Sequence, residues 1–232
     1  MIVRFFTETV GMVATVARNA RRSAKRFGAL EPMHLLQVEI DCSPVRELGT
    51  LTEARIERAR IGLTSRLATM EAAGQALRWL RRAAPNRSAE PQLWYEVNML
   101  LDRLDHLAVA QDAVHDRAHD RVHDGSQDNE TATLLAATGL RLLSASGWGL
   151  ELECCVRCRK PCPERSRSIL DVAAGGIVCR DCGGRGDVLS AAERLAFLDS
   201  AAGTGTSLNP FARRVIDFVE QAFEIHGRGD AT

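Results

Sequence analysis

The chain lacks the features of a membrane or exported protein. None of its 232 residues fall in a run approaching the ~18 consecutive apolar residues that a membrane span needs. The first eleven residues, MIVRFFTETVG, lack the cationic start, apolar stretch and small-residue cleavage site of a signal peptide. Its seven cysteines are not spaced as a disulfide framework, because six lie between 154 and 182. We therefore expect a soluble cytoplasmic protein with no membrane partner.

Net charge and catalytic motifs are also missing. Thirty Lys and Arg balance thirty Asp and Glu, so only the distribution of charge can indicate a partner. The chain has no G-x-S-x-G motif, no Walker A loop and no H-E-x-x-H motif. Carboxylate pairs such as Asp102 and Asp105 fall in an ordinary helical pattern, where a solvated face is the common role. We expect a protein that is not an enzyme.

Residues 1–60 have the pattern of a small β domain. Turn residues separate four short runs rich in β-branched and apolar residues. The runs are IVRFF, MVATVA, MHLLQVEI and LGTLTEA. They predict four strands that form a small barrel.

From about residue 61 the apolar residues recur at helical spacing. The pattern predicts a helix that ends at residues 84–88, a second that begins near Pro91, and a third over roughly 131–145. Ser190 and Glu193 form a capping box, which predicts a helix over 190–199. A last helix is predicted from about 209, with Asn209 as its cap and Pro210 as its first residue. Its predicted inward-facing residues are Phe211, Val215, Phe218, Val219 and Phe223.

These patterns predict an α+β protein of several domains. In chain order we expect a β domain (1–60), a helical domain (61–146), a cysteine-rich module (147–189), helices that complete the helical domain (190–226) and a disordered tail (227–232). A polar linker rich in His and Asp interrupts the helical domain at 112–130.

The linker contains the repeat HDRAHDRVHD, which places His115, His119 and His123 one helical turn apart. On a helix these side chains would share a face and could chelate Zn²⁺ or Ni²⁺. The alternative is a solvated, charge-alternating helix end or linker, which is the commoner role of such a pattern.

The strongest motif is a pair of C-x₂-C sequences separated by twenty residues, Cys155 with Cys158 and Cys179 with Cys182. Each C-x₂-C turn can donate two thiolates to one metal ion, and two such turns complete a tetrahedral Cys₄ zinc site. Because cysteine fills all four positions, no site remains for water. The spacing therefore predicts one structural zinc ion.

Two further cysteines, Cys154 and Cys162, flank the first C-x₂-C turn. Either could replace a ligand, as the pair Cys154 and Cys158 or the pair Cys158 and Cys162. Only Cys155 and Cys158 repeat the spacing of the second turn. The surplus thiols leave open a weaker hypothesis, a redox sensor in which mild oxidation releases the metal.

The charge is most uneven in residues 16–27, VARNARRSAKRF, which we call the basic segment. It contains five cations and no carboxylate: Arg18, Arg21, Arg22, Lys25 and Arg26. Arg binds phosphate through its forked donors, and Phe27 could stack on an unpaired base. The segment indicates nucleic-acid binding, and the alternative is a solvated loop that keeps the protein soluble.

Three segments in the same order resemble the RecO family of DNA repair proteins. They are ARNARRSAKRFGALEP (17–32), GWGLELECCVRC (147–158) and GGIVCRDC (175–182). Each alone is a weak signal, but three in order are hard to produce by chance. The resemblance covers nearly the whole chain.

The resemblance implies an N-terminal OB-fold, a helical domain and a Cys₄ zinc module inserted in the helical part. It also implies that this barrel lacks its first strand, because MIVRFFTETVG aligns with the usual second strand. It carries DNA contact onto the five cations of the basic segment, and zinc onto Cys155, Cys158, Cys179 and Cys182.

For function, the resemblance implies a nucleoid-associated protein that binds single- and double-stranded DNA and anneals complementary strands. Such proteins work with RecR to load RecA recombinase onto strands coated by single-strand-binding protein, and they dock the C-terminal tail of that protein. The rival hypothesis is a zinc-ribbon adaptor that binds only proteins. It shares the Cys₄ prediction but expects no salt-dependent affinity for DNA.

Overall fold

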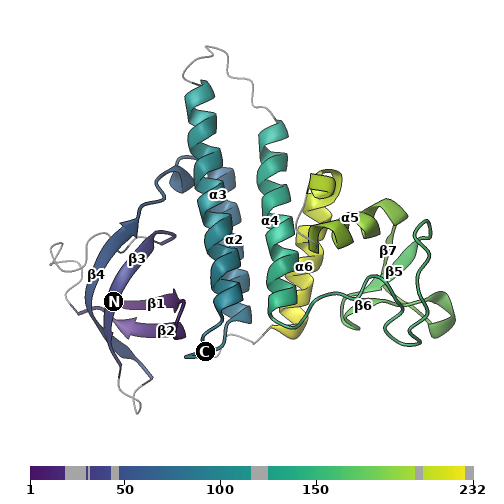
Figure 1. The fold of residues 1–232 in the computed structure, drawn as a ribbon, viewed down its shortest axis with the longest axis horizontal. Coiled ribbons are helices and arrows are strands. Elements are labelled where there is room, and N and C mark those ends of the chain that lie inside the picture. The colour runs from purple at the N-terminus through teal and green to yellow at the C-terminus, as the bar shows by residue number, and fades with distance from the viewer. Residues whose placement is uncertain (19–29, 31, 43–46, 116–124, 202–205, 228–232) are drawn as a thin grey trace. The chain divides into compact units, whose positions relative to one another are not determined.

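A computed structural model describes residues 1–18, 30, 32–42, 47–115, 125–201 and 206–227 (Figure 1). The described chain is an α+β protein that divides into two compact units. One contains residues 1–73 and 84–119, and the other contains residues 74–83 and 120–232. Within the described ranges, no helix is long and apolar enough to cross a membrane.

The four predicted strands are present: β1 (Ile2–Thr7), β2 (Gly11–Val16), β3 (Leu35–Asp41) and β4 (Gly49–Arg58). They form one sheet in the order β1-β2-β4-β3. The β1/β2 and β3/β4 pairs are antiparallel, whereas β2 and β4 pair in parallel over two residues only. The outer strands β1 and β3 do not pair with each other in the described part of the chain, so no closed barrel is seen.

A small apolar core supports this sheet. Its fully buried members are Ala17, Leu51 and Ala54, and partly buried side chains from β1 and β3 pack around them. The β1–β2 turn requires Gly11, which has φ +77° and lies so close to Ser88 that a Cβ atom would overlap the Ser88 carbonyl.

In the same unit, α3 (Pro91–His115) packs against the 3-10 turn η2 (Gly62–Thr64), where Asp105 accepts hydrogen bonds from the Gly62 and Leu63 amides. Arg60, only 2 % exposed, joins the sheet to this helix. Its guanidinium donates to Asp102 and Asn98 on α3 and to the Met33 carbonyl, at 2.7–2.8 Å. Because each bond uses a different nitrogen, the buried charge is well satisfied.

The second unit contains the second half of α2 (Leu67–Ala83), together with α4 (Gly125–Ala145), α5 (Ala191–Ala201) and α6 (Ala212–His226). Its core includes Trp79, whose ring stacks on Phe223 with a centroid distance of 5.9 Å. Glu220 on α6 accepts hydrogen bonds from the Gln75 amide, the Trp79 indole and Arg82. The residues of α2 after position 73 therefore fold with the C-terminal helices.

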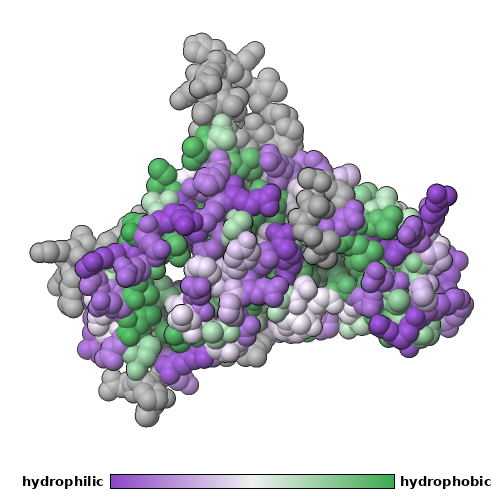
Figure 2. Space-filling model, in the orientation of Figure 1, coloured by the Kyte–Doolittle hydropathy of each residue, from purple (hydrophilic) through white to green (hydrophobic). Residues whose placement is uncertain are grey.

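A small sheet lies in the cysteine-rich part of the second unit (Figure 1). It consists of β5 (Ser168–Asp171), β6 (Gly176–Ile177) and β7 (Asp187–Leu189), in the order β6-β5-β7 with antiparallel pairing. Hydrophilic residues predominate on the face seen in Figure 2, including the outer rim of this part.

The capping box that begins α5 is confirmed. The Ser190 amide donates to the Glu193 carboxylate at 2.7 Å, and the Glu193 amide donates to the Ser190 hydroxyl at 3.2 Å. Arg214 on α6 forms an ion pair with the same carboxylate and donates to the Val188 carbonyl on β7. Glu193, 7 % exposed, therefore joins α5 to α6.

Three predicted helix starts are wrong. α2 begins at Leu67 rather than at about 61, because residues 62–64 form the 3-10 turn η2. α4 begins at Gly125 rather than 131, and Asp128 in its first turn stabilises this longer start through the helix dipole. α6 begins at Ala212, and Asn209 does not cap it: its side chain accepts a hydrogen bond from Asn129.

Pro210 accordingly lies inside a preceding 3-10 helix, η4 (Thr206–Phe211). Of the five residues predicted to face inward from the last helix, four are buried and Phe211 is half-buried. The inward face of α6 is therefore predicted well, although its start is not.

Candidate metal centre

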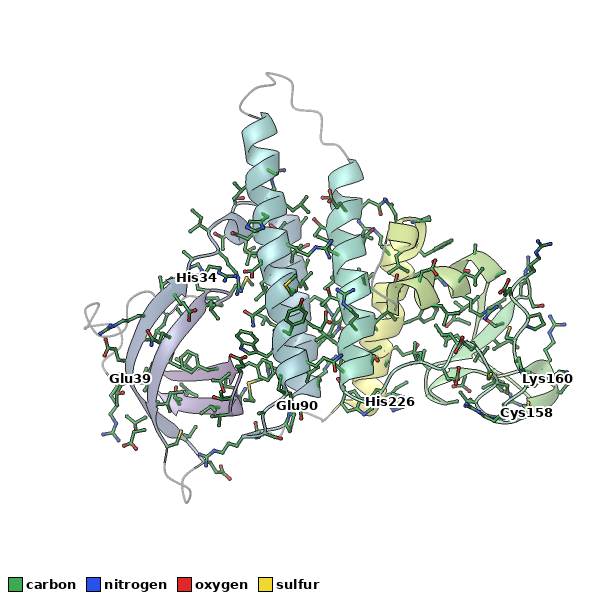
Figure 3. All side chains as sticks on the ribbon, viewed as in Figure 1. His34, Glu39, Glu90, Cys158, Lys160 and His226 are labelled. Carbon is green, nitrogen blue, oxygen red and sulfur yellow. The ribbon has the colours of Figure 1, made fainter. Side chains whose placement is uncertain are left out.

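The first C-x₂-C turn lies at the end of a hairpin formed by residues 152–164, which we call the first hairpin. Its two arms are joined by hydrogen bonds from the Cys162 amide to the Glu153 carbonyl at 2.8 Å and from the Cys155 amide to the Lys160 carbonyl at 2.9 Å. Inside the turn, the Arg159 amide donates to the Cys155 carbonyl at 2.8 Å. Figure 3 labels Cys158 and Lys160 on this turn.

The second C-x₂-C turn follows β6. Cys179 precedes the 3-10 turn η3 (Arg180–Cys182), and the Cys182 amide donates to the Cys179 carbonyl at 3.1 Å. Gly183 then ends the turn at φ +71°, a conformation that glycine adopts without steric cost. The chain therefore turns sharply enough to point both thiols of the pair to one side.

Three hydrogen bonds join the two turns to each other. Arg157 donates to the Cys182 carbonyl at 2.6 Å, and the Val156 amide donates to the Ile177 carbonyl at 2.9 Å. The Cys179 amide also donates to the Cys155 sulfur at 3.4 Å. The protein's own hydrogen bonds, from both backbone and side-chain atoms, therefore place the two turns.

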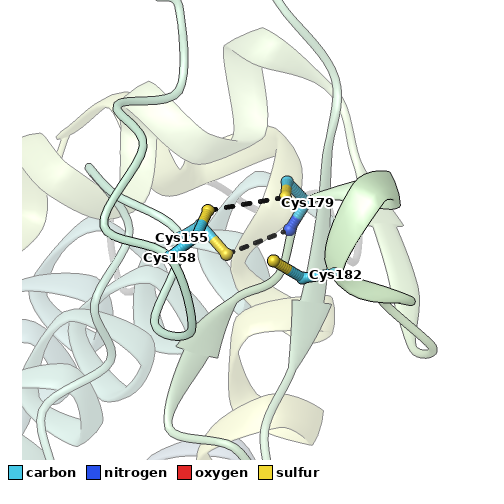
Figure 4. Close-up of side chains that lie close together, drawn as sticks. All are labelled: Cys155, Cys158, Cys179 and Cys182. Carbon is cyan, nitrogen blue, oxygen red and sulfur yellow. Dashed lines mark hydrogen bonds between the residues drawn. The ribbon is translucent and has the colours of Figure 1, made fainter.

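The four predicted cysteines lie together in the structure (Figure 4). Their sulfur atoms all lie within 4.8 Å of one another, and the sulfurs of Cys158 and Cys179 are 3.8 Å apart. A tetrahedral zinc site with ~2.3 Å bonds has sulfur–sulfur edges of about 3.8 Å. The four residues, which we call the cysteine cluster, therefore fit a tetrahedral metal ion.

The protein environment shifts the pKa values of two thiols of this cluster in opposite directions. Hydrogen bonds from the Cys179 and Cys158 amides lower the pKa of Cys155 to about 6. Hydrogen bonds with the thiols of Cys179 and Cys158 raise the pKa of Cys182 to about 12. Ionisation of Cys155 is thus favoured and ionisation of Cys182 is opposed. A bound divalent cation would stabilise all four sulfurs as thiolates.

Glu151 orders the approach to the first hairpin. Its carboxylate accepts hydrogen bonds from the Glu153 amide at 3.0 Å and the Cys154 amide at 3.2 Å, and it pairs with Arg159 at 3.3 Å. The Glu153 amide contributes most to holding the pKa of Glu151 below its ordinary value. The carboxylate therefore stays ionised and holds the hairpin arm at neutral pH.

The two surplus cysteines do not join the cluster. Cys154 pairs with Pro161 in an antiparallel bridge, and the Cys162 sulfur lies 3.8 Å from the Pro163 carbonyl. Neither is part of the group of four. The alternative ligand pairs are therefore not those that the structure brings together.

One side chain at the base of the first hairpin was not expected from the sequence. Arg194 on α5 donates to the Leu152 carbonyl at 3.1 Å and to the Pro163 and Glu164 carbonyls at 3.0 and 3.2 Å. The residue is 2 % exposed. Since its partners are 30 to 42 positions away in the chain, no local pattern could have indicated it.

The basic segment is described only at its beginning. Arg18 is exposed in a turn directly after β2. Arg21, Arg22, Lys25, Arg26 and Phe27 lie outside the described residues. Of the histidine repeat, His115 is the last residue of α3, and His119 and His123 lie outside the described residues. DNA contact by the segment and metal binding by the repeat stay predictions.

Comparison with known proteins identifies the family. A family model described as Recombination protein O N terminal matches residues 1–60, and one described as Recombination protein O C terminal matches residues 121–216. A DNA repair protein RecO of Geobacter sulfurreducens is 31 % identical over 206 residues, which cover 88 % of this chain and 74 % of that protein. The chain belongs to the RecO family.

Other RecO proteins are similar over much of their length. The protein of Rubrobacter xylanophilus is 30 % identical over 78 % of this chain and 64 % of its own, and that of Streptomyces griseus is 27 % identical over 86 % and 74 %. This RecO-family chain thus spans about two thirds to three quarters of these relatives. The C-terminal match contains all four residues of the cysteine cluster, and the N-terminal match contains the basic segment.

Proposed function

We propose that this chain is a DNA-binding mediator of recombinational repair and has no enzymatic activity. Its membership of the RecO family, matched at both ends of the chain, carries the proposal. The relatives are named DNA repair proteins. We further propose that it acts with RecR to load RecA onto strands coated by single-strand-binding protein, whose C-terminal tail it docks, at the cytoplasmic nucleoid.

We propose that the N-terminal sheet is an OB-fold without its first strand. The observed order β1-β2-β4-β3 leaves β1 and β3 as outer strands. A fifth strand that paired with both would close this sheet into the five-stranded Greek-key barrel of OB-folds. OB-folds bind nucleic acid through one sheet face and its adjacent loops. The basic segment connects β2 to β3 and would be such a loop.

Strand annealing in this proposal needs no catalytic residue. Two DNA strands repel each other through their phosphates, and bound cations lower that repulsion while the base edges stay free to pair. Arg18, Arg21, Arg22, Lys25 and Arg26 would supply the cations. Single- and double-stranded DNA would both bind, because phosphate contacts carry no sequence information.

The cysteine cluster would hold one zinc ion through Cys155, Cys158, Cys179 and Cys182. Four thiolate ligands leave no open position for water or substrate, so the ion would crosslink the two turns rather than catalyse. Its binding energy would stabilise the cysteine-rich part of the chain.

The test is fluorescence anisotropy of labelled single-stranded DNA across a salt series, with zinc content measured on the same sample. The wild-type chain should bind tightly with a steep salt dependence and contain one zinc ion. Replacing Arg21 and Arg22 with alanine should weaken binding and lower the slope of log affinity against log salt by up to about two, since two phosphate contacts are lost.

A matched control removes two exposed arginines of the cysteine-rich part, Arg165 and Arg167, which should leave the slope unchanged. An unchanged slope in the Arg21 and Arg22 variant would contradict the assignment of DNA contact to the basic segment. A wild-type chain that contains zinc but does not bind DNA would favour the rival function, a zinc-ribbon adaptor for proteins.

A further inference from the structure

Arg194 is a buried cation with no ion-pair partner among the described residues. The residue is 2 % exposed, and all of its hydrogen bonds in the described chain go to main-chain carbonyls. The Nε atom is buried with no hydrogen-bond partner. The neighbouring carboxylate of Glu193 is taken by Ser190 and Arg214. A buried charge left in this state destabilises the fold unless an opposite charge lies nearby.

The carbonyls that Arg194 holds lie on both arms of the first hairpin. Leu152 comes three residues before Cys155, and Pro163 and Glu164 end the second arm. A single planar guanidinium therefore closes the base of the hairpin that presents Cys155 and Cys158, and fixes it to the first turn of α5. This is a positioning contact, because Arg194 holds the backbone at the base of the hairpin that carries two ligands and does not touch their sulfurs.

A loaded cluster would add negative charge to the same hairpin. Four thiolates around one divalent ion carry a net charge of minus two, and one pair of the sulfurs stands on the hairpin that Arg194 closes. We infer that Arg194 couples metal binding to the docking of the first hairpin on α5 through its hydrogen bonds to both arms of that hairpin. This inference rests on the proposed metal site.

Coupling distinguishes this role from simple structural support. If Arg194 only packed the hairpin against α5, its loss would destabilise the metal-free and the metal-loaded chain equally. If Arg194 couples hairpin docking to metal binding, its loss also reduces the stabilisation that the metal produces. A thermodynamic cycle that combines the Arg194 substitution with removal of the metal would measure this reduction. Groups that orient metal ligands from the second shell typically change metal affinity 10–100-fold when replaced.

The experiment measures zinc affinity by chelator competition on the full chain, and the shift in melting temperature that zinc produces. Arg194→Met keeps a long apolar side chain but removes the charge and the hydrogen-bond donors. Arg194→Lys keeps the charge but loses the planar guanidinium that reaches both arms of the hairpin. Arg213→Met on α6 is the control, because Arg213 is exposed. We expect at least a tenfold loss of zinc affinity and a smaller zinc-induced shift in Arg194→Met, a smaller loss in Arg194→Lys, and none in the control.

Wild-type zinc affinity and a wild-type melting shift in Arg194→Met would overturn this inference alone. If Arg194→Met does not fold, Arg194→Lys decides, and an unchanged zinc affinity in that variant would overturn it. A wild-type chain that binds no zinc would instead overturn the proposed metal site and this inference together. Cobalt substitution adds a readout, because a retained thiolate-to-cobalt absorption band would show that the variant still uses the same four sulfurs.

Discussion

At the scale of residues, position on the first hairpin decides which cysteine reaches the cluster. Cys154 and Cys155 are adjacent, but adjacent residues of an extended chain point to opposite sides. Cys154 pairs with Pro161, and Cys155 lies on the side that the second turn approaches. The C-x₂-C spacing predicted this choice because a turn of that length brings both its thiols to one side.

Replacing Cys179 with serine should remove the metal and destabilise the second unit, because three ligands hold zinc far less tightly than four and the apo site keeps no crosslink. Zinc content by mass spectrometry under native conditions and thermal melting with and without chelator measure both effects. Cys162→Ser is the control and should keep one zinc ion. Stoichiometric zinc in a folded Cys179→Ser variant would contradict the ligand assignment.

The sequence predicts the cysteine cluster but not the residues that support it. The four ligands lie in two local motifs, and their spacing is recognisable because each short turn must present two thiolates to one metal ion. Arg194 and Arg60, by contrast, bind carbonyls and side chains far away in the chain, at positions set only by tertiary packing. An arginine in a helix, such as Arg194, or in a connection between elements, such as Arg60, is usually solvated, so nothing in the local pattern marked either one as buried.

At the scale of elements, the strands and most helix positions followed from periodicity, and the errors are at helix starts. The four N-terminal strands and the helix at Pro91 lie where their patterns placed them. The predicted cap of the last helix, Asn209, instead accepts a hydrogen bond from the Asn129 side chain, 80 positions away in the chain. An asparagine before a helix predicts a cap only when no tertiary partner competes for it.

The surroundings of Glu193 at the start of α5 predict how the free energy of unfolding depends on pH. Burial alone raises the pKa of Glu193, but hydrogen bonds from Ser190 and the charge of Arg214 outweigh it and hold the pKa below the ordinary value of 4.5. A lowered pKa contributes stability that is present above the ordinary value and is lost as pH falls through the folded value. Glu193→Gln should therefore cost about 1 kcal/mol at pH 7, and the cost should shrink below pH 4.5.

Urea unfolding of both chains at pH 7, 5, 4 and 3.5 measures this cost as a difference, so that loss of metal at low pH affects both alike. Asp217→Asn on α6 is the control for removing one exposed carboxylate. A cost that stays constant down to pH 3.5 would show that Glu193 acts through its shape and not through its charge.

At the scale of the whole molecule, the cysteine cluster and the N-terminal sheet belong to different compact units. The cysteine cluster lies in the unit of residues 74–83 and 120–232, and strands β1 to β4 lie in the other. The sheet is held by its own strand pairing and by contacts such as those of Arg60 with Asp102 and Met33. Its stability therefore does not depend directly on a metal ion.

Removing the metal with a chelator should accordingly raise amide hydrogen exchange in residues 147–226 and leave exchange in β1 to β4 unchanged. Exchange followed by mass spectrometry resolves the two regions in one experiment. The Cys179→Ser chain without chelator should give the same pattern. Equal loss of protection in the N-terminal strands would show that the two units unfold as one.

The division of α2 between the units limits how the protein can be cut or recombined. A fragment that begins at residue 120 contains every cysteine of the cluster but not Trp79, whose ring covers Phe223, and not the Gln75 and Arg82 side chains that bind Glu220. Such a fragment would expose an apolar surface and aggregate. Chimaeras between relatives must therefore exchange residues 74–83 together with the C-terminal half, although residues 84–119 separate the two segments in the chain.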